Sequence, residues 1–181
     1  MGNLEGQLLV ASPAMSDPNF ARTVVAIANH DEEGALGIVL NRPSDTEVVE
    51  AVPELEGVVD DDDVVFVGGP VQPASIVVLA EFQDPGEAAY LVVDGIGLVS
   101  DRTGLERLDV ATARRRVYAG YTGWGPGQLE AELEREDWIL APIQAQDVFD
   151  EEPGELWARV LARKGGQFRL LARMPLDPSV N

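Results

Sequence analysis

Short apolar runs separated by turn-forming residues dominate the first hundred residues, and they constrain the fold more than any other feature of the sequence. Runs rich in Val, Ile and Leu and bounded by Gly, Pro, Asn and Asp are typical of β-strands. The polar segment HDEEG (30–34) joins two such runs, which predicts a β-hairpin. The sequence predicts strands at 7–12, 23–29, 35–41, 64–69, 75–82 and 89–100.

The second half of the chain mixes helical and extended patterns. It predicts helices at 126–136 and 151–166, strands at 117–124 and 137–142, a short helix with a loop within 103–116, and a closing strand or extended tail at 167–175. In the first half, Ser44 and Glu47 fit a capping box for a helix over 45–52. Because strands and helices are segregated and neither a repeat nor a linker is visible, we expect one α+β domain over residues 1–181.

The chain has no cysteine, which excludes disulfides, thiolate catalysis and sulfur-ligated metal sites. Its first residues, MGNLEGQLLV, lack a positively charged start and contain Glu5, so they do not resemble a secretory signal. The longest apolar stretches are far shorter than the roughly 18 residues that a membrane span needs. We therefore expect a soluble, cytoplasmic protein with no membrane contact.

The sequence is strongly acidic, with 32 Asp and Glu against 13 Lys and Arg and a formal net charge of −19. Such a chain is repelled by phosphate backbones and anionic membranes unless its basic residues cluster. Arg114–Arg116 is the one candidate cluster, and a solvated strand edge or helix end paired with carboxylates is the favoured interpretation. Together with the lack of a helix-turn-helix signature, this makes direct nucleic-acid binding an unfavoured hypothesis.

Few residues indicate catalysis, and none indicates a metal or another cofactor. His30, the single histidine, lies among acidic residues in NHDEEG, where a base or metal ligand and a turn histidine bonded to backbone are both possible. Consecutive turn residues diverge and rarely converge on one ion, so the second interpretation is favoured. Asp60–Asp63 lacks the spacing of a calcium loop, GGPV (68–71) lacks the residues of a P-loop, and no serine lies in a nucleophile elbow.

Two arginines could form an anion site. Arg42 follows Asn41 at the end of one hairpin strand and Arg22 lies near the other end of the hairpin, so both guanidinium groups could face one cavity. A second candidate is GYTGWGPGQLEAEL (120–133), where Pro126 and Gly127 begin a helix whose first N–H groups lack partners. Gln128 could bind a ligand there, although the glutamates that follow disfavour a strongly anionic one.

Several blocks of the chain resemble the YqgE/AlgH family of bacterial proteins. They are D-P-x-F, H-x-x-x-G-A-x-G-x-V-x-N-x-P, G-G-P-V and G-W-x-x-G-Q-L-E-x-E, in that order, and the resemblance extends from about residue 6 to about residue 172. The chain departs from the family in its acidic loop EGVVDDDD and in its C-terminus MPLDPSVN, which replaces a short Gly/Ala-rich tail. The resemblance implies an α+β fold with a bent, partly bifurcated mixed sheet and helices packed around it.

The family implies little about activity, although one branch is named as a transcriptional regulator of exopolysaccharide synthesis. We expect a non-enzymatic regulatory or binding protein that acts indirectly, through an unknown protein or small-molecule partner. The alternative is an enzyme or a small-anion-binding protein with a polar site near Arg22, His30, Arg42 and Gln128. The candidate ligand-binding residues are Arg22, His30, Asn41, Arg42, Gln72 and Gln128. Further motif positions of interest are Asp17, Phe20, Pro43, Gly69, Pro70, Trp124, Gly127 and Glu130.

Overall fold

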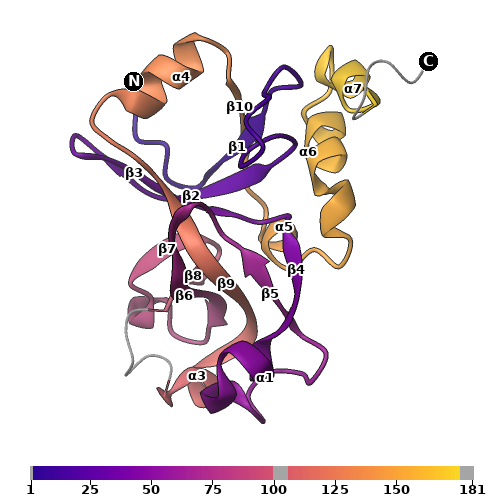
Figure 1. Ribbon diagram of the computed structural model, residues 1–181. Coiled ribbons are helices and arrows are strands. Elements are labelled where there is room, and N and C mark those ends of the chain that lie inside the picture. Colours follow the sequence, from indigo (N-terminus) through magenta and orange to yellow (C-terminus); the bar gives the residue numbers. More distant parts are fainter. Residues whose placement is uncertain (1, 100–105, 176–181) are drawn as a thin grey trace.

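Ten strands of the described residues form a continuous mixed sheet with helices around it, which confirms the predicted α+β class (Figure 1). The computed structural model describes residues 2–99 and 106–175. The strands are β1 (Gln7–Ala11), β2 (Val24–Asp31), β3 (Gly34–Val39), β4 (Pro43–Glu47), β5 (Val64–Val67), β6 (Val71–Phe82), β7 (Tyr90–Val93), β8 (Ile96–Leu98), β9 (Thr112–Trp124) and β10 (Trp138–Pro142). The helices are α1 (Val48–Ala51), α3 (Leu108–Ala111), α4 (Gln128–Glu134), α5 (Ala145–Val148), α6 (Leu156–Lys164) and α7 (Phe168–Leu171), with the short 3-10 segments η1 (Pro53–Leu55), η2 (Pro85–Glu87) and η3 (Pro153–Glu155).

The sheet forks along β9, its longest strand. The main strand order is β10-β1-β2-β3-β9-β6-β8-β7, and β4 and β5 form a branch from it. The last residues of β9 pair with β3, whereas its middle pairs with β5 in the same direction and with β6 in the opposite direction. The expected bent and partly bifurcated sheet is therefore present. The expected hairpin is β2–β3, which turns at residues 32–33.

Two glycines allow the fork. The Gly68 N–H donates to the carbonyl of Ala119 on β9, and the Gly68 carbonyl accepts the N–H of Val39 at the end of β3, each at 2.9 Å. A Cβ on Gly69 would lie 2.2 Å from the Tyr121 carbonyl oxygen, closer than any side chain permits. GGPV is therefore a structural element in which backbones of three strands approach closely.

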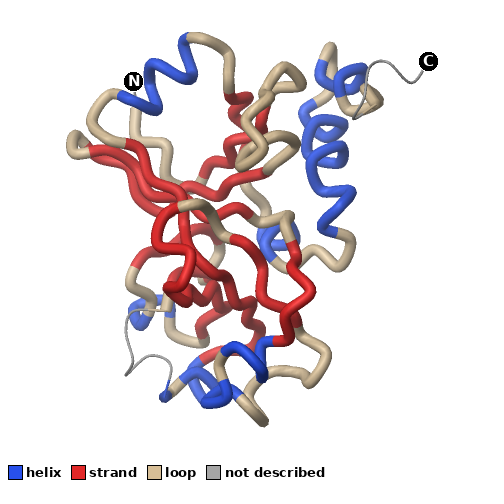
Figure 2. Tube along the Cα trace, in the orientation of Figure 1, coloured by secondary structure: helices blue, strands red, loops and turns tan. Residues whose placement is uncertain are grey.

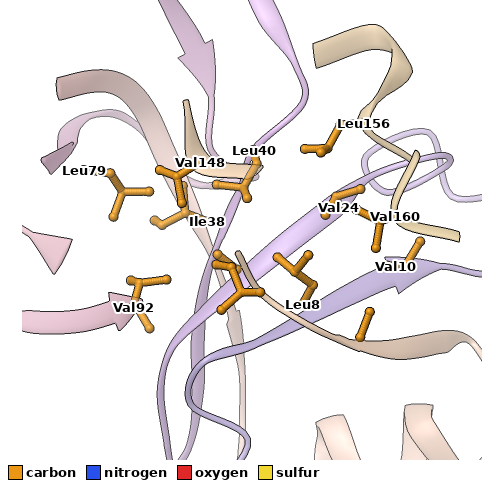
Figure 3. Packing of buried hydrophobic residues seen from close by; sticks show 14 of the residues in the cluster. Leu8, Val10, Val24, Ile38, Leu40, Leu79, Val92, Val148, Leu156 and Val160 are labelled. Atoms are coloured by element: carbon orange, nitrogen blue, oxygen red, sulfur yellow. The ribbon is translucent and has the colours of Figure 1, made fainter. Parts of the chain in front are cut away.

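Helices cover both faces of the sheet, so several strands are apolar on both sides. Alternate residues of β1 and β2 point to opposite faces. Leu8 and Val24 pack with Leu156 and Val160 of α6 in the largest core cluster (Figure 3), and the reverse face of β1 and β2 packs against Leu129 of α4. A third cluster includes Val48 of α1 and Leu108 of α3; these two short helices lie at the lower end of the sheet (Figure 2). This two-sided burial explains why the sequence reads as continuous apolar runs.

Three parts of the chain differ from the sequence-based expectation. The segment predicted as a helix over 45–52 is strand β4 followed by one turn, α1, because the Ser44 hydroxyl donates to the Val65 carbonyl of β5 and makes no capping box. The run 89–99 is not one strand but the hairpin β7–β8, since Asp94 and Gly95 both adopt positive φ angles, 41° and 80°. Residue 100 lies outside the described residues.

The third difference is at the C-terminal side. Residues 168–171 form helix α7 and not the expected closing strand or extended tail, because Gly165 and Gly166 reverse the chain after α6 with φ angles of 78° and 55°. The ambiguous segment 103–116 begins outside the described residues, then forms α3 and the first part of β9. The tail 176–181 lies outside the described residues too.

Candidate functional site

A small cleft lies where the D-P-x-F block meets the G-W-x-x-G-Q-L-E-x-E block. We call it the tryptophan cleft, and its volume is about 220 Å³. Four segments form it: the loop before β2, the end of β9, helix α4 and the turn into β10. Its lining side chains are Met15, Asp17, Phe20, Thr122, Trp124, Gln128, Glu132, Arg135, Asp137 and Trp138.

The Glu132 carboxylate fixes the two indole rings of the cleft. Its Oε2 accepts the Nε1–H groups of both Trp124 and Trp138 at 2.8 Å. Its Oε1 accepts the Gln128 side-chain amide at 3.0 Å, and the Gln128 oxygen accepts the backbone N–H of Gly125 at 3.1 Å. Three donors therefore hold one carboxylate, which makes Glu132 a positioning group for the rings. Gln128 is one of the predicted ligand-binding residues, and it lines this cleft.

The aromatic rings stand edge to face. Trp124 and Trp138 have centroids 6.1 Å apart at an interplanar angle of 77°, and Phe20 meets Trp138 at 5.6 Å and 77°. Phe20 is placed by a turn in which the Asp17 carbonyl accepts the backbone N–H groups of Phe20 and Ala21. The D-P-x-F block thus brings a third ring to the cleft, an edge-to-face arrangement that aromatic pairs prefer.

His30 lies outside this cleft, on β2, where it is bonded on both ring nitrogens. Nδ1 lies 3.3 Å from the backbone N of Leu4, which can only donate, so the ring proton is on Nε2 and points to Glu130 at 2.9 Å. The backbone N–H of Glu130 itself and then His30 hold the pKa of the Glu130 carboxyl below its usual range. His30 ties the N-terminal segment to α4.

Arg22, Asn41 and Arg42 come together around the loop 12–23. The Arg42 guanidinium donates to the carbonyls of Pro18 and Ala21, and the Asn41 side chain bonds the backbone of Arg22 and Val24. Burial lowers the pKa of both guanidinium groups, those of Arg22 and Arg42, from its ordinary value. These contacts brace the loop that carries Phe20.

The Arg22 side chain and the other predicted residues contact different parts of the protein. The Arg22 guanidinium donates to the Pro175 carbonyl at 2.7 Å and stacks 4.0 Å over the ring of Trp157, whereas the Arg42 guanidinium donates to the carbonyls of Pro18 and Ala21. Gln72 follows the GGP turn with a φ of 46° and accepts the Ser75 hydroxyl. The structure thus brings together three of the six residues at one loop and places His30, Gln72 and Gln128 at three other points. Their ligand-binding roles stay predictions.

Two larger cavities carry less specific chemistry. One of about 310 Å³ lies beside Arg115 and Arg116, but the Arg116 guanidinium already binds the carbonyls of Val148 and Asp150 and stacks 4.4 Å over Phe66. The other, about 520 Å³, is a mostly apolar groove beside the edge strand β10. Arg114 pairs with Glu81 at 2.8 Å, so the basic cluster is largely occupied within the molecule.

The fold and the site place the chain in one class of protein: α+β proteins with a forked mixed sheet and a cleft lined by tryptophans. The model of the AlgH-like family, DUF179, matches residues 8–169. The chain belongs to the AlgH-like family, which confirms the resemblance seen in its sequence blocks. In the described ranges, no helix has the length and apolar character to cross a membrane, and no group of three or more acidic or histidine residues is arranged to hold a metal ion.

Relatives share the whole length of the chain. A UPF0301 protein of Streptomyces coelicolor is 42% identical over 187 residues, which cover 100% of this chain and 97% of the relative. A UPF0301 protein of Thermobifida fusca is 39% identical over 191 residues, with 99% and 96% covered.

Two solved structures resemble the fold over nearly the whole chain. The crystal structure of protein DIP2367 from Corynebacterium diphtheriae matches with a TM-score of 0.85 and 28% identity, covering 95% of this chain and 93% of that one. The solution structure of the AlgH protein from Pseudomonas aeruginosa matches with a TM-score of 0.74 and 31% identity, covering 96% and 95%.

Sequence reasoning missed six side chains of the cleft: Met15, Thr122, Glu132, Arg135, Asp137 and Trp138. A signal existed for Glu132, which lies four residues after Gln128 and therefore on the same face of α4. Trp138 gave no signal, because an apolar residue that starts a strand is indistinguishable from a core residue in sequence. The cleft is a tertiary feature, made by segments more than 100 residues apart.

Proposed function

We propose that this chain is a non-enzymatic binding protein that recognises its ligand in the tryptophan cleft. The observation that carries the proposal is the Glu132 network, in which one carboxylate holds two indole rings and Gln128 beside an open cavity. Preorganised aromatic rings with a few fixed polar groups are what small-ligand sites are made of. The convergence of two separate family blocks on the cleft adds support.

A regulatory role would then work through ligand-dependent binding of a partner, in the cytoplasm, and without contact to DNA. The net charge of −19 supports this, as does the involvement of Arg114 and Arg116 in contacts within the molecule. The alternative is an enzyme or small-anion site near Arg22, His30, Arg42 and Gln128. Its support is that Arg42, which follows β3, donates to carbonyls of the loop 12–23 that contains Arg22. It is the weaker proposal, because each of those four side chains binds a different partner within the protein.

The test uses the indole N–H resonances of the ¹⁵N-labelled protein. The chain has three tryptophans, and Trp157, whose N–H donates to the Ala11 carbonyl, is a reference inside the same molecule. Titration with organic cations, carboxylates, nucleotides and short peptides should shift the Trp124 and Trp138 signals for at least one class while the Trp157 signal stays in place.

Variants test whether the shifts of the Trp124 and Trp138 signals arise from binding in the tryptophan cleft. Glu132→Gln should weaken binding at least about tenfold, since it disturbs both rings, and a tenfold change corresponds to about 1.4 kcal/mol. Glu134→Gln, an exposed change on the same helix, is the matched control and should bind like the unaltered protein. The proposal fails if every class leaves the three indole signals unchanged or shifts them all alike.

A further inference from the structure

The charges of the tryptophan cleft point to the class of its ligand, on the assumption that the cleft is a binding site as proposed above. Three carboxylates line it, those of Asp17, Glu132 and Asp137, against one guanidinium, that of Arg135. The whole chain carries a formal charge of −19. A cleft lined by one sign of charge concentrates ligands of the opposite sign, and here it disfavours anions.

Not all of these charges are compensated within the protein. Arg135 donates twice to Oδ2 of Asp137, at 2.7 and 3.0 Å, and Oδ1 of Asp17 accepts the backbone N–H of Asn19. The other carboxylate oxygen of Asp17 and that of Asp137 make no hydrogen bond to any described residue. These two oxygens are available to accept N–H groups of a ligand, whereas Glu132 is engaged by its three donors.

A hydroxyl in the wall of the cleft offers a further polar contact to a ligand. Thr122 lines the cleft and is only 1% exposed, yet its side chain makes no hydrogen bond within residues 2–99 and 106–175. Buried polar groups are nearly always hydrogen-bonded in native structures. The Thr122 oxygen is not among the described buried atoms that lack a partner, so it is open to the cleft and can bond to a polar group of a ligand.

The aromatic rings of the cleft are a further feature that favours a cationic ligand. The faces of tryptophan and phenylalanine carry partial negative charge and attract ammonium and guanidinium groups within about 6 Å of the ring centre. Phe20 and Met15 at the rim are half-buried and present apolar surface to a ligand. The cleft is thus lined by carboxylates that can bind a positive head and by aromatic and apolar side chains that can contact the head and a short stem.

We propose that the tryptophan cleft binds the ammonium or guanidinium end of an organic cation with a short apolar stem. The cation is either a free small amine or the Lys or Arg side chain of a partner protein, and the two share the same chemistry at the cleft. Asp17 and Asp137 bind the positive group, Thr122 contributes its hydroxyl, and the rings fixed by Glu132 contact the head and stem.

The experiment follows the indole N–H signals during titration with probes of one size and three charges: n-butylammonium, n-butanol and butyrate. Only n-butylammonium should shift the signals of Trp124 and Trp138, with Trp157 unmoved. Its affinity should fall as NaCl rises from about 20 mM to about 300 mM, because salt screens partly exposed charges. MgCl₂ and KCl at equal ionic strength should not produce the same shifts.

Charge-matched variants separate a local site from the general acidity of the chain. Asp137→Asn should weaken n-butylammonium binding about threefold to fivefold, as expected for a partly exposed charge pair. Asp61→Asn removes the same charge from the exposed loop between β4 and β5 and should leave the affinity unchanged. Thr122→Val, which preserves the shape of the side chain, should weaken binding as well, and circular dichroism verifies that each variant is folded.

The two sources of the cation are distinguished with blocked tripeptides, acetyl-Ala-Lys-Ala-amide and acetyl-Ala-Arg-Ala-amide. Tighter binding of a peptide than of n-butylammonium identifies a partner side chain, and the reverse identifies a small amine. Equal effects of Asp137→Asn and Asp61→Asn would overturn the proposal. If only butyrate or n-butanol shifts the indole signals, the proposal of a cationic ligand is overturned and the proposed binding function stands. If no ligand class shifts the indole signals in either screen, both proposals are overturned.

Discussion

At the scale of single residues, the clearest dependence in the molecule is that of two indole rings on Glu132. Trp124 and Trp138 are 6% and 4% exposed, so an indole N–H that lost its acceptor would be desolvated and unpaired. The single amide oxygen of Gln is a poorer acceptor for two N–H groups than a carboxylate is. Leaving a buried donor unsatisfied costs about 1 to 3 kcal/mol.

Glu132→Gln should therefore lower the free energy of unfolding by about 1 to 3 kcal/mol, measured from urea unfolding curves. Glu134→Gln on the same helix is exposed and should stay within about 0.5 kcal/mol of the unaltered protein. Equal unfolding midpoints for the two variants would show that the indole N–H groups find other acceptors.

Tyr118 shows the opposite situation, a buried polar atom without a partner. The ring is fully buried against Phe66, and its hydroxyl has no hydrogen-bond partner in the described residues. Burial raises the pKa of the Tyr118 hydroxyl far above its ordinary value, which the nearby Arg116 opposes in part. A raised pKa in the folded state means that the native protein holds this proton more tightly than the unfolded chain does.

Tyr118→Phe should raise the free energy of unfolding at pH 7 by about 1 kcal/mol, because it removes an unsatisfied buried hydroxyl. Stability contributed by a raised pKa is complete below the unfolded pKa and is lost as pH rises beyond it. The unaltered protein should thus lose stability above about pH 10, and the variant should lose less. Urea unfolding at pH 7 and pH 10.5 measures both effects. A variant less stable by more than about 1 kcal/mol at pH 7 would contradict the account.

At the scale of elements, the fork of the sheet depends on the Gly68–Gly69 pair. A Cβ on Gly69 meets the backbone of Tyr121 at 2.2 Å, and backbone cannot move aside as the end of a flexible side chain can. Gly69→Ala should lower the free energy of unfolding by about 3 kcal/mol or more, since overpacking forces backbone shifts. Gly154→Ala is the matched control, because a Cβ there meets nothing within 4 Å, and it should be nearly neutral. Thermal unfolding of both variants measures the difference.

The elements also show how far the sequence predicts the fold. The β2–β3 hairpin, α4 and α6 were predicted because their signals are local: two apolar runs joined by a polar turn, or a proline and a glycine near the helix ends. Strand β4 was predicted as a helix because PSDTE pairs with β5 through contacts that are not local in sequence. The segment of helix α7 was predicted as a closing strand or extended tail because QFRLLARMP has no periodicity strong enough to indicate a helix.

The sequence singled out several residues of the tryptophan cleft but did not predict that they lie together. Phe20, Trp124 and Gln128 were singled out by their blocks, but their convergence depends on the path of the loop before β2, which Arg42 and Asn41 hold from β3's end. Asp17 and Asp137 line the same cleft although they are 120 residues apart in the sequence. No local pattern encodes such a meeting, and the choice of site residues therefore needed the fold.

At the scale of the whole molecule, the charge of −19 governs which macromolecules can approach. In a gel shift with duplex DNA at about 20 mM salt, where phosphate contacts are strongest, the protein should form no complex. A basic DNA-binding domain run alongside verifies that the assay detects binding. A complex that weakens steeply as salt rises would show direct DNA contact and would contradict a regulatory role through partners.

The same charge should act on the stability of the fold. Exposed carboxylates repel one another in the native state, and Asp60, Asp61 and Asp62 are exposed on one loop. Raising NaCl from about 20 mM to about 300 mM shortens the range of this repulsion below the spacing of distant charges. The melting temperature should rise by about 2 to 4 °C, the shift that 1 kcal/mol produces in a chain of this size.

Removing charge should imitate adding salt. The double variant Asp61→Asn, Asp62→Asn should melt at a higher temperature than the unaltered protein at low salt and should respond less to NaCl, because less repulsion is left to screen. A pair of neutral exchanges at exposed sites, Gln146→Asn and Gln167→Asn, controls for the effect of substitution alone. A melting temperature that falls with salt would mean that ion pairs such as Arg163–Asp147 outweigh the repulsion. That pair is nearly buried at its carboxylate and screened little, so the net effect should follow the exposed charges.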